Sequence, residues 1–251
     1  MHRALILWPD GVERETYVKM AYPPPGRPDR QLINEGIGWF LAQICNLPVP
    51  PHAGYMMLPS AVLAAAHPDV PSSSDGELAW LCSAEPHRAL IVNQGDAELS
   101  EMMMMELSRW RHLHATLALD EWIANDDRHW RNLIRRAPGD FVLIDHDNAF
   151  TGPNWLADHL FARRSEDFPN RLYGSMENFL SHSSEIRKLS SAMLPAAEAF
   201  KSQLSDNAEE VTDWLTALLD SDEDQWSLAA FIAYRAKETA NAIKRRYQLL
   251  T

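Results

Sequence analysis

Residues 125 to 147 read NDDRHWRNLIRRAPGDFVLIDHD, a stretch in which aspartate, asparagine and histidine crowd between apolar runs. Asp127 and Asn132 are five residues apart, and Asp145 follows thirteen residues later. In phosphoryl transfer, a carboxylate accepts the proton of the attacking hydroxyl, while an amide oxygen and a second carboxylate hold magnesium ions. These residue types at this spacing therefore indicate phosphoryl-transfer chemistry.

The segment between the last two of these residues predicts a β-hairpin. NLIRR and FVLID are strand-like, and the APGD that joins them is suited to a tight turn. Such a hairpin would carry Asn132 at its entry and Asp145 at its exit, within reach of a common metal ion. Protein kinases place a base, an amide and a metal-binding aspartate in the same order.

A cation for the phosphates and an acidic partner for it precede this segment. Lys19 lies in the strand-like run TYVKMAY, where alternation turns it away from the face of Val18. Glu35 lies in the first strongly helical segment. A lysine on a strand and a glutamate on a helix are usually surface residues, but this pair has the order and the elements that a kinase needs.

The elements that must position these residues divide into two parts. Up to about residue 95 we expect strands at 3–8, 16–22, 54–58, 77–83 and 88–93, with a helix that Asp29 caps and that ends near residue 46, and a short helix at 60–66. From residue 96 to 251 the pattern is helical, with one or two central helices over 97–125 and an amphipathic segment over 226–250. The fold class expected is α+β, with a small strand-rich part (1–95) and a larger helical part (96–251).

The bulk composition narrows the class of protein. The net charge of −12 disfavours broad binding to nucleic acid, whose backbone is also negative. Cys45 and Cys82 are too few for a disulfide framework and are expected to be small buried residues. The first residues lack the features of a signal peptide, and prolines interrupt the longest weakly charged stretch. We therefore expect a soluble cytoplasmic protein without a membrane segment.

Two motifs give the chain a family resemblance. DRHWRN, residues 127–132, followed by Ile144-Asp145-His146, resembles the catalytic segment of the HipA-like kinases and, more distantly, of the phosphoinositide kinases, which write D-R-H where other kinases write H-R-D. LINEGIGWFLAQICNLPVP, residues 32–50, resembles the HipA-like helix that bears a glutamate and runs into a GLPVP-type segment. These motifs support the resemblance over residues 17–50 and 120–150.

The resemblance implies a bilobal, protein-kinase-like fold and an ATP- and magnesium-dependent transfer of phosphate to a serine or threonine hydroxyl, with a protein as substrate. Asp127 would be the general base, Asn132 and Asp145 the magnesium ligands, and Lys19 the phosphate contact that Glu35 supports. Arg128 and His129 would brace the catalytic segment, and Asp147 would be a further metal or outer group. Asp126 is the alternative base if the register is off by one. HipA-like kinases often act as toxins or regulators with a neutralising partner protein, which is here an analogy.

The chain also departs from the family pattern. Kinases cover the phosphates with a glycine-rich or serine-bearing loop before the lysine strand, and ILWPDGVERETYVK holds a single glycine there. Either the loop is abbreviated, with Asp10 and Gly11 at its tip, or it lies outside this sequence, or nucleotide binding is weak. The hinge that holds adenine is expected around residues 80–84.

Two other functions stay open. A kinase-like module without the phosphate loop would be a binding protein rather than an enzyme. His146 and Asp147 form an HD pair, preceded by His112, His114 and His129, so a metal-dependent phosphohydrolase is the other alternative. The HD pair ends a strand-like run and His112 and His114 cannot share one helical face, which disfavours the phosphohydrolase.

Overall fold

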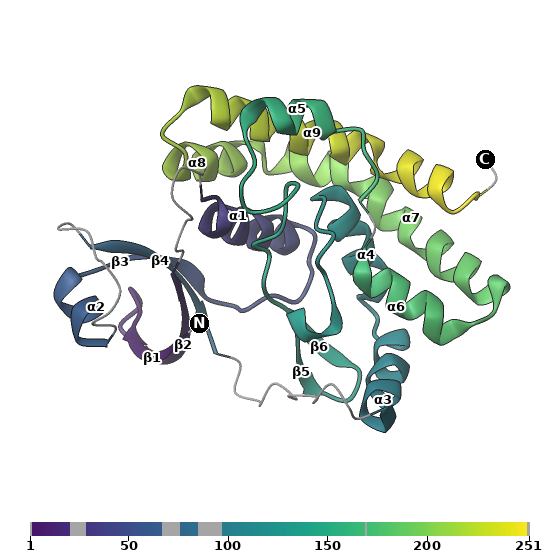
Figure 1. Ribbon diagram of the computed structural model, residues 1–251, viewed down its shortest axis with the longest axis horizontal. Coiled ribbons are helices and arrows are strands. Elements are labelled where there is room, and N and C mark those ends of the chain that lie inside the picture. Colours follow the sequence, from purple (N-terminus) through teal and green to yellow (C-terminus); the bar gives the residue numbers. More distant parts are fainter. Residues whose placement is uncertain (1, 21–28, 67–75, 85–96, 169, 250–251) are drawn as a thin grey trace.

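A computed structural model describes residues 2–20, 29–66, 76–84, 97–168 and 170–249. The fold is α+β, as expected, with a small antiparallel sheet in the N-terminal part and a larger helical part after it (Figure 1). The strand expected at 88–93 and the expected boundary at residue 95 lie outside the described residues. Within the described residues, no helix combines the length and the apolar character needed to cross a bilayer.

The N-terminal sheet has the strand order β1-β2-β4-β3, and every neighbouring pair is antiparallel. The strands follow the expected runs closely, because alternating apolar residues and the turn at Pro9–Gly11 specify the first hairpin. Two helices belong to this part, α1 before β3 and α2 after it. The bounds are β1 His2–Leu7, β2 Glu13–Met20, α1 Gln31–Ile44, β3 Ala53–Leu58, α2 Ser60–Ala66 and β4 Glu77–Ser83.

The start of α1 differs in detail from the expectation. The N-cap residue is Arg30 and not Asp29, although the Asp29 carboxylate accepts a 2.8 Å hydrogen bond from the backbone N–H of Gln31. Arg30 is held in place by an ion pair with Asp224 and lies over the ring of Trp155. Tertiary contacts of Arg30 therefore set where the helix begins.

The helical part contains α3 and α4, a short hairpin, and then a series of helices. The segment expected as one or two central helices is two, separated at residues 109–112. The predicted hairpin is present as β5 and β6, preceded by a 3₁₀ turn at Trp130–Asn132. The bounds are α3 Ala97–Ser108, α4 Leu113–Trp122, β5 Leu133–Ala137, β6 Asp140–Leu143, α5 Ala157–Arg163, α6 Arg171–Leu180, α7 Ser183–Asp206, α8 Ala208–Leu218 and α9 Asp222–Arg246.

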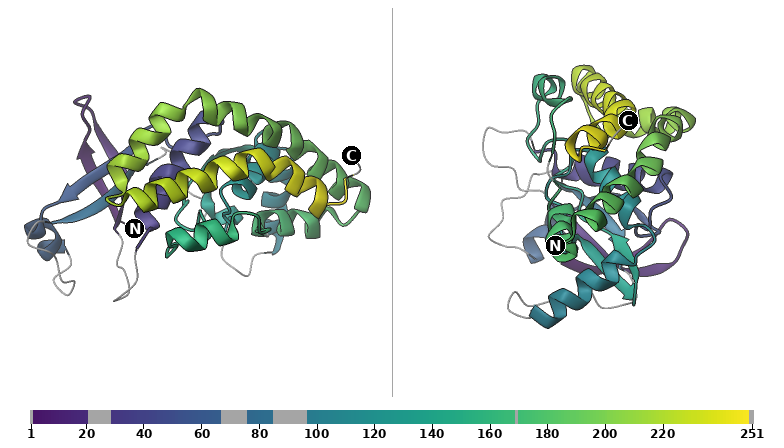
Figure 2. Two further views of the ribbon diagram at one scale, coloured as in Figure 1. Left: turned by 90° about the horizontal axis from the view of Figure 1, so that it is seen from above. Right: turned by 90° about the vertical axis from the view of Figure 1, so that its right-hand side faces the viewer.

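One large hydrophobic core joins α1 to the helical part. The long helices α7 and α9 lie side by side, and α7 also packs against α4 (Figure 2). Trp122 of α4 stacks on Phe200 of α7, and Phe40 of α1 stacks on Trp214 of α8. The sheet has a separate small cluster on its opposite face, centred on three buried residues, Val18, Ala79 and Leu81. The glutamate-bearing helix thus packs with the helical part as well as with the sheet.

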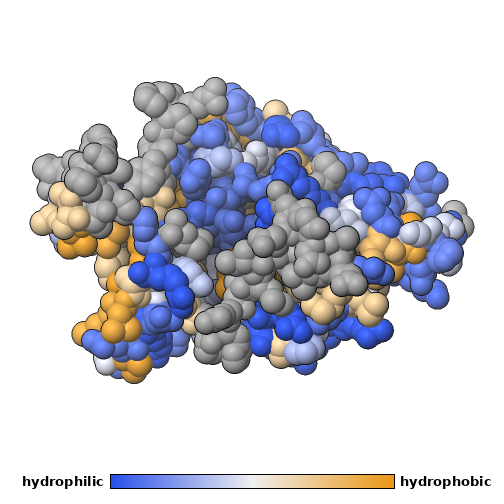
Figure 3. All heavy atoms as spheres, turned by 60° about the horizontal axis from the view of Figure 1, so that its bottom comes forward, coloured by the Kyte–Doolittle hydropathy of each residue, from blue (hydrophilic) through white to orange (hydrophobic). Residues whose placement is uncertain are grey.

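The tip of the first hairpin projects from the rest of the molecule (Figure 2). Figure 2 shows β1 and β2 projecting beyond the other elements, and Figure 3 shows apolar side chains gathered over the end of the molecule that carries the sheet. Leu5, Leu7, Val12 and Met57 are among the exposed apolar residues of this part. Of the two cysteines, Cys82 is buried and Cys45 is half-buried, and neither forms a disulfide.

Candidate active site between the sheet and the hairpin

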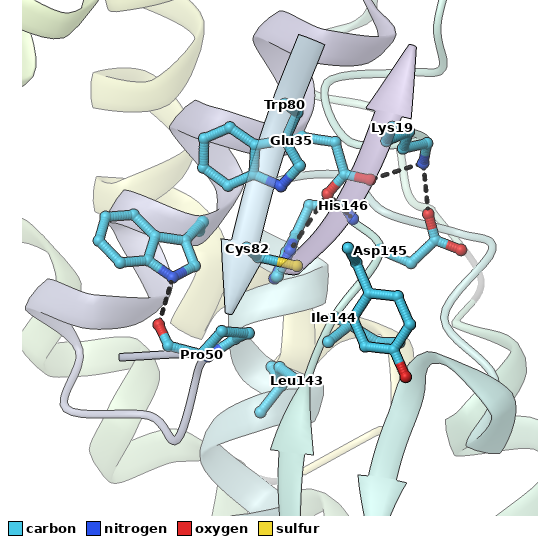
Figure 4. Close-up of a pocket in the computed structure, with 11 residues that line it drawn as sticks. Lys19, Glu35, Pro50, Trp80, Cys82, Leu143, Ile144, Asp145 and His146 are labelled. Carbon is cyan, nitrogen blue, oxygen red and sulfur yellow. Dashed lines mark hydrogen bonds and ion pairs between the residues drawn. The ribbon is translucent and has the colours of Figure 1, made fainter. Parts of the chain in front are cut away.

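Lys19 lies at the centre of the site. It is near the end of β2, opposite Trp80 in β4, and alternation along β2 turns it away from the buried Val18. Its Nζ donates to Glu35 Oε1 at 2.6 Å, to Asp145 Oδ1 at 2.7 Å and to Asp147 Oδ2 at 2.7 Å. The predicted pairing of Lys19 with Glu35 is therefore present, and Figure 4 shows it together with the contact to Asp145. Asp147 is a third carboxylate at the same ammonium group.

Glu35 joins three separate segments of the chain. It projects from α1 and its side chain is only 3% exposed. While Oε1 accepts from Lys19, Oε2 accepts a 2.8 Å hydrogen bond from the backbone N–H of His146. Glycine at position 38 makes this close approach feasible, because a Cβ there would lie 2.5 Å from the Cβ of His146. Helix α1 therefore packs directly on the segment that follows β6.

The hairpin β5–β6 brings the two predicted metal ligands together. Asn132 ends the 3₁₀ turn and Asp145 follows β6, and the Asn132 amide nitrogen donates to Asp145 Oδ2 at 2.8 Å. The backbone of Asp145 has a φ of 62°, in the left-handed region that L-residues seldom adopt. The buried guanidinium of Arg128 donates to the backbone carbonyls of Ile144 and Asp145, so Arg128 braces this turn as expected.

Asp127 lies beside this group rather than inside it. Its carboxylate forms an ion pair with Arg171 at the start of α6 and accepts a 3.4 Å hydrogen bond from Asn148. Asn148 also donates to Asp147 Oδ1 at 2.7 Å, so a single amide links Asp127 to the carboxylates around Lys19. The side chain of Asp127 is 30% exposed, which leaves it accessible to an acceptor group. Asp126, the alternative base, is exposed.

Burial and charge act against one another in this cluster. For Lys19, burial disfavours the charge, but the three carboxylates outweigh that effect and raise its pKa above the ordinary range. Burial also opposes ionisation of Asp145, yet Lys19 and Arg128 keep its pKa below the usual value. Burial raises the pKa of Asp147, and the neighbouring charge of Asp145 adds to that effect. Burial raises the pKa of Glu35 to about 7, although Lys19 and the His146 amide favour its ionised form.

The side chains present fit a hard divalent cation. Oxygen atoms of Glu35, Asp145 and Asp147 all lie within 4.8 Å of one another. Carboxylate oxygens are the ligands that magnesium and calcium prefer. The Asn132 amide adjoins Asp145 through its nitrogen, and its oxygen accepts a 3.3 Å hydrogen bond from the backbone N–H of His129. Asp147, expected as an additional metal group, therefore belongs to the cluster. Glu35, expected only to support Lys19, adds a third carboxylate.

An apolar pocket adjoins the charged cluster. It is lined from the sheet side by Trp80 and Cys82, and from the hairpin side by Leu143 and Ile144 (Figure 4). Its other lining residues are Tyr17, Lys19, Glu35, Trp39, Pro50, Asp145 and His146. Trp80 and Cys82 lie in the segment where the adenine hinge is expected, and residues 85–96, which follow it, lie outside the described residues.

Sequence reasoning missed Tyr17 and Leu143 as lining residues. Both could have been found by period-two alternation, because each precedes a predicted site residue by two positions on a strand or its extension. Pro50 and Trp39 could not have been found that way, since a hydrogen bond from the Trp39 indole to the Pro50 carbonyl depends on tertiary packing.

The turn of the first hairpin does not cover Lys19. From Glu13, where β2 begins, to Lys19 there are six residue steps, or roughly 20 Å of extended chain. The turn at Asp10 and Gly11 lies beyond that point, where Asp10 forms an ion pair with Arg14. This separation disfavours the first of the three explanations, in which the turn is an abbreviated phosphate loop. The described residues contain no glycine-rich loop over the lysine.

The geometry disfavours a histidine-based metal centre. Among the described residues, the group of potential metal ligands contains three carboxylates and no histidine. His146 is buried, and burial lowers its pKa well below the ordinary value. Its Nδ1 lies 3.9 Å from a Glu35 carboxylate oxygen. The carboxylate group contains no histidine that could act with it as a metal ligand. His112 accepts a hydrogen bond from Arg111, far from the hairpin exit in sequence.

Comparison with known proteins identifies no relative of this chain. No protein-family model matches the chain, and no curated protein or solved structure matches it. What this chain does is therefore inferred from its own residues and their arrangement.

Proposed function

We propose that this chain is a HipA-like kinase that uses ATP and magnesium to phosphorylate a serine or threonine hydroxyl, with a protein as the acceptor. One observation carries the proposal: Lys19, Glu35, Asn132 and Asp145, which sequence reasoning selected from distant segments, contact one another. A lysine–glutamate ion pair beside an asparagine and an aspartate is the arrangement that kinases use to hold phosphates and metal ions. The sheet-plus-helices architecture is compatible with a bilobal kinase-like fold.

Each residue has a role that follows from its chemistry. Lys19 would neutralise phosphate oxygens in exchange for part of its contact with Asp145 and Asp147. Asn132 and Asp145 would hold magnesium, with Asp147 as a further oxygen ligand, and magnesium when bound would neutralise the charge of the phosphates. The apolar pocket beside Lys19, with Tyr17, Trp80 and Leu143, has the character that an adenine ring requires.

In the proposed transfer step one proton moves, one bond to phosphorus forms and another breaks. Asp127 would accept the proton of the acceptor hydroxyl while that oxygen forms a bond to the γ-phosphorus. The bond from the γ-phosphorus to the bridging oxygen breaks, and ADP leaves with the electron pair. Before this step Asp127 must release Arg171, whose side chain is 68% exposed and has room to move. A positioned base of this kind contributes about 10²- to 10⁴-fold to the rate.

A radiolabelled-ATP assay in cell lysate tests the proposal. The wild type should transfer label to protein in a magnesium-dependent way, and Asp127→Asn should lower the transfer at least about 100-fold. Asp126→Asn is the matched control, because it removes an adjacent, exposed carboxylate and should leave labelling intact. The reverse pattern would assign the base to Asp126, and equal labelling by all three proteins would exclude both.

A second function is favoured by the lack of a glycine-rich loop over Lys19 among the described residues. The described residues provide nothing that covers the phosphate side of Lys19, so a binding module without catalysis is the alternative. Calorimetry with ATP, with and without magnesium, separates the two functions. A kinase should bind ATP and magnesium together, whereas a degenerate module should bind neither, and binding of a transition metal without ATP would favour a phosphohydrolase.

A further inference from the structure

Asp120 is a buried carboxylate that the proposed chemistry does not use. It lies near the end of α4, and its residue is 1% exposed. Both of its oxygens accept from Arg128 Nε at 3.1 Å, and they also accept from the side-chain amides of Asn125 and Asn170 at 3.3 Å. Removing a carboxylate from water is costly unless it is paired and hydrogen-bonded, and these donors meet that requirement for Asp120.

Arg128 connects Asp120 to the hairpin through its hydrogen bonds. The Arg128 side chain is fully buried, and its Nη1 donates to the backbone carbonyls of Asn132 (3.4 Å), Ile144 and Asp145 (3.4 Å). These carbonyls belong to the two predicted metal ligands and to the residue between β6 and Asp145. Fixing them fixes the strained backbone of Asp145 and hence the direction of its carboxylate.

Asn170 connects the same carboxylate to the start of α6, beside the candidate base Asp127. Its amide nitrogen donates to Asp120, while its oxygen accepts from the backbone N–H of Tyr173 at 2.9 Å and caps α6. Helix α6 begins at Arg171, which forms the ion pair with Asp127. One buried carboxylate thus contacts the supports of both the metal ligands and the candidate base.

We propose that Asp120 is a positioning residue, which orients Arg128 so that Asn132 and Asp145 converge on one metal ion. The proposal rests on the proposed function, since it concerns the same metal site. Stability alone is a poor explanation for the arrangement, because a buried ion pair is on average no more stabilising than well-packed apolar residues of the same volume. Hydrogen bonds from a rigid planar guanidinium, in contrast, specify positions of backbone carbonyls.

The neighbouring residue provides a matched control. Glu121 is also 1% exposed and is also paired with arginines, Arg246 and Arg235, but its side-chain partners belong to α9. Glu121→Gln therefore removes a buried negative charge from the same turn of α4 without changing the support of the hairpin. Asp120→Asn and Glu121→Gln should both lower the melting temperature of the protein.

The test measures binding of Mn²⁺ alone to the full chain by electron paramagnetic resonance. Asp120→Asn should weaken Mn²⁺ affinity about 10- to 100-fold, the range seen when a residue that orients a metal ligand is replaced. Glu121→Gln should leave the affinity of the folded protein unchanged. Equal loss in the two variants, or unchanged affinity in Asp120→Asn, would overturn the positioning role.

A second variant covers the case in which Asp120→Asn fails to fold. Arg128→Lys keeps a positive charge beside Asp120 but lacks the second branch that reaches the carbonyls, so it should weaken Mn²⁺ binding in the same way. Unaltered affinity in Arg128→Lys would contradict the proposal. A wild-type protein that binds neither Mn²⁺ nor magnesium with ATP would instead refute the proposed function itself, and that failure is visible before any substitution is made.

Discussion

The side-chain amide of Asn132 donates a 2.8 Å hydrogen bond to the carboxylate of Asp145, although thirteen residues separate them. The β5–β6 hairpin closes this distance, with Leu133 opposite Leu143 in the antiparallel register. The amide thereby adjoins a cluster of three carboxylates, those of Glu35, Asp145 and Asp147, whose oxygen atoms lie within 4.8 Å of one another. Four consequences of the geometry around this pair can be measured.

Asn132→Ala should weaken the binding of magnesium and ATP together. The substitution removes an oxygen-bearing ligand and also frees Asp145 to rotate, so the magnesium concentration that gives half-maximal ATP binding should rise about 10-fold or more. Titration calorimetry at several magnesium concentrations measures it. Asn241→Ala is the control, since Asn241 is an exposed residue of α9 whose side-chain amide donates to Glu238. Equal midpoints for the three proteins would remove Asn132 from the metal site.

Lys19→Met should destabilise the protein and make its stability depend on divalent cations. Without Lys19, three carboxylates remain close together, one of them buried, so we expect a loss of about 3 kcal/mol in the free energy of unfolding. Magnesium should then raise the melting temperature of the variant more than that of the wild type, because a bound cation replaces the lost charge. Thermal unfolding with and without magnesium measures both effects.

Lys244→Met provides the comparison for Lys19. Lys244 pairs with Glu198 at 3.2 Å, but Glu198 is 57% exposed, and surface pairs of this kind contribute about 1 kcal/mol or less. An equal magnesium response in Lys244→Met and Lys19→Met would show that the response is not local to the site.

Glu35→Gln should change how stability depends on pH. Because burial raises the pKa of Glu35 from 4.5 to about 7, the unfolded chain releases this proton at a lower pH than the folded protein does. The free energy of unfolding of the wild type, relative to the variant, should therefore fall as the pH rises from about 4.5 to 7, by up to about 3 kcal/mol. Urea unfolding across this range measures the difference. A difference that rises with pH would mean that Lys19 outweighs burial at Glu35.

Gly38→Ala should disturb the contact between α1 and the hairpin exit. The new Cβ would lie 2.5 Å from His146 Cβ, so His146 or the helix must shift, at a cost of about 1 to 3 kcal/mol. Gly174→Ala in α6 meets no atom within 4 Å and should instead stabilise the helix by about 0.5 to 1 kcal/mol. Chemical unfolding of the two variants should give shifts of opposite sign, and destabilisation by both would indicate a helix-wide effect.

Much of the framework could be predicted from local patterns. Alternation in β2 and the helical spacing in α1 place Lys19 and Glu35 on facing elements, and the APGD turn specifies the hairpin that joins Asn132 to Asp145. These predictions succeed because each depends on periodicity or on turn chemistry within a short segment. The kinase function itself stays a prediction.

The parts that could not be predicted depend on contacts between distant segments. Asp120 lies in an apolar helical run and gives no sign of its pairing with Arg128, because that pairing joins α4 to the segment before the hairpin through tertiary contacts. The chain turns between them at Ala124, which has a left-handed backbone that the sequence does not signal. Asp147 could be named as a metal group, but its contact with Lys19 depends on how β2 sits over the hairpin exit. The distance of the Asp10 turn from Lys19 depends on the length of β2, which turn chemistry alone does not specify.

The two members of the Lys19–Glu35 ion pair are carried by different elements, a strand of the sheet and the helix α1. Glu35 is carried by a helix whose Phe40 stacks on Trp214 of the helical part, whereas Lys19 is carried by a sheet with its own small cluster around Val18. Any tilt of the sheet away from the helices must therefore pull the ammonium group off its carboxylate and leave a buried negative charge. The ion pair therefore ties the position of the sheet on α1 to the charge balance at Glu35.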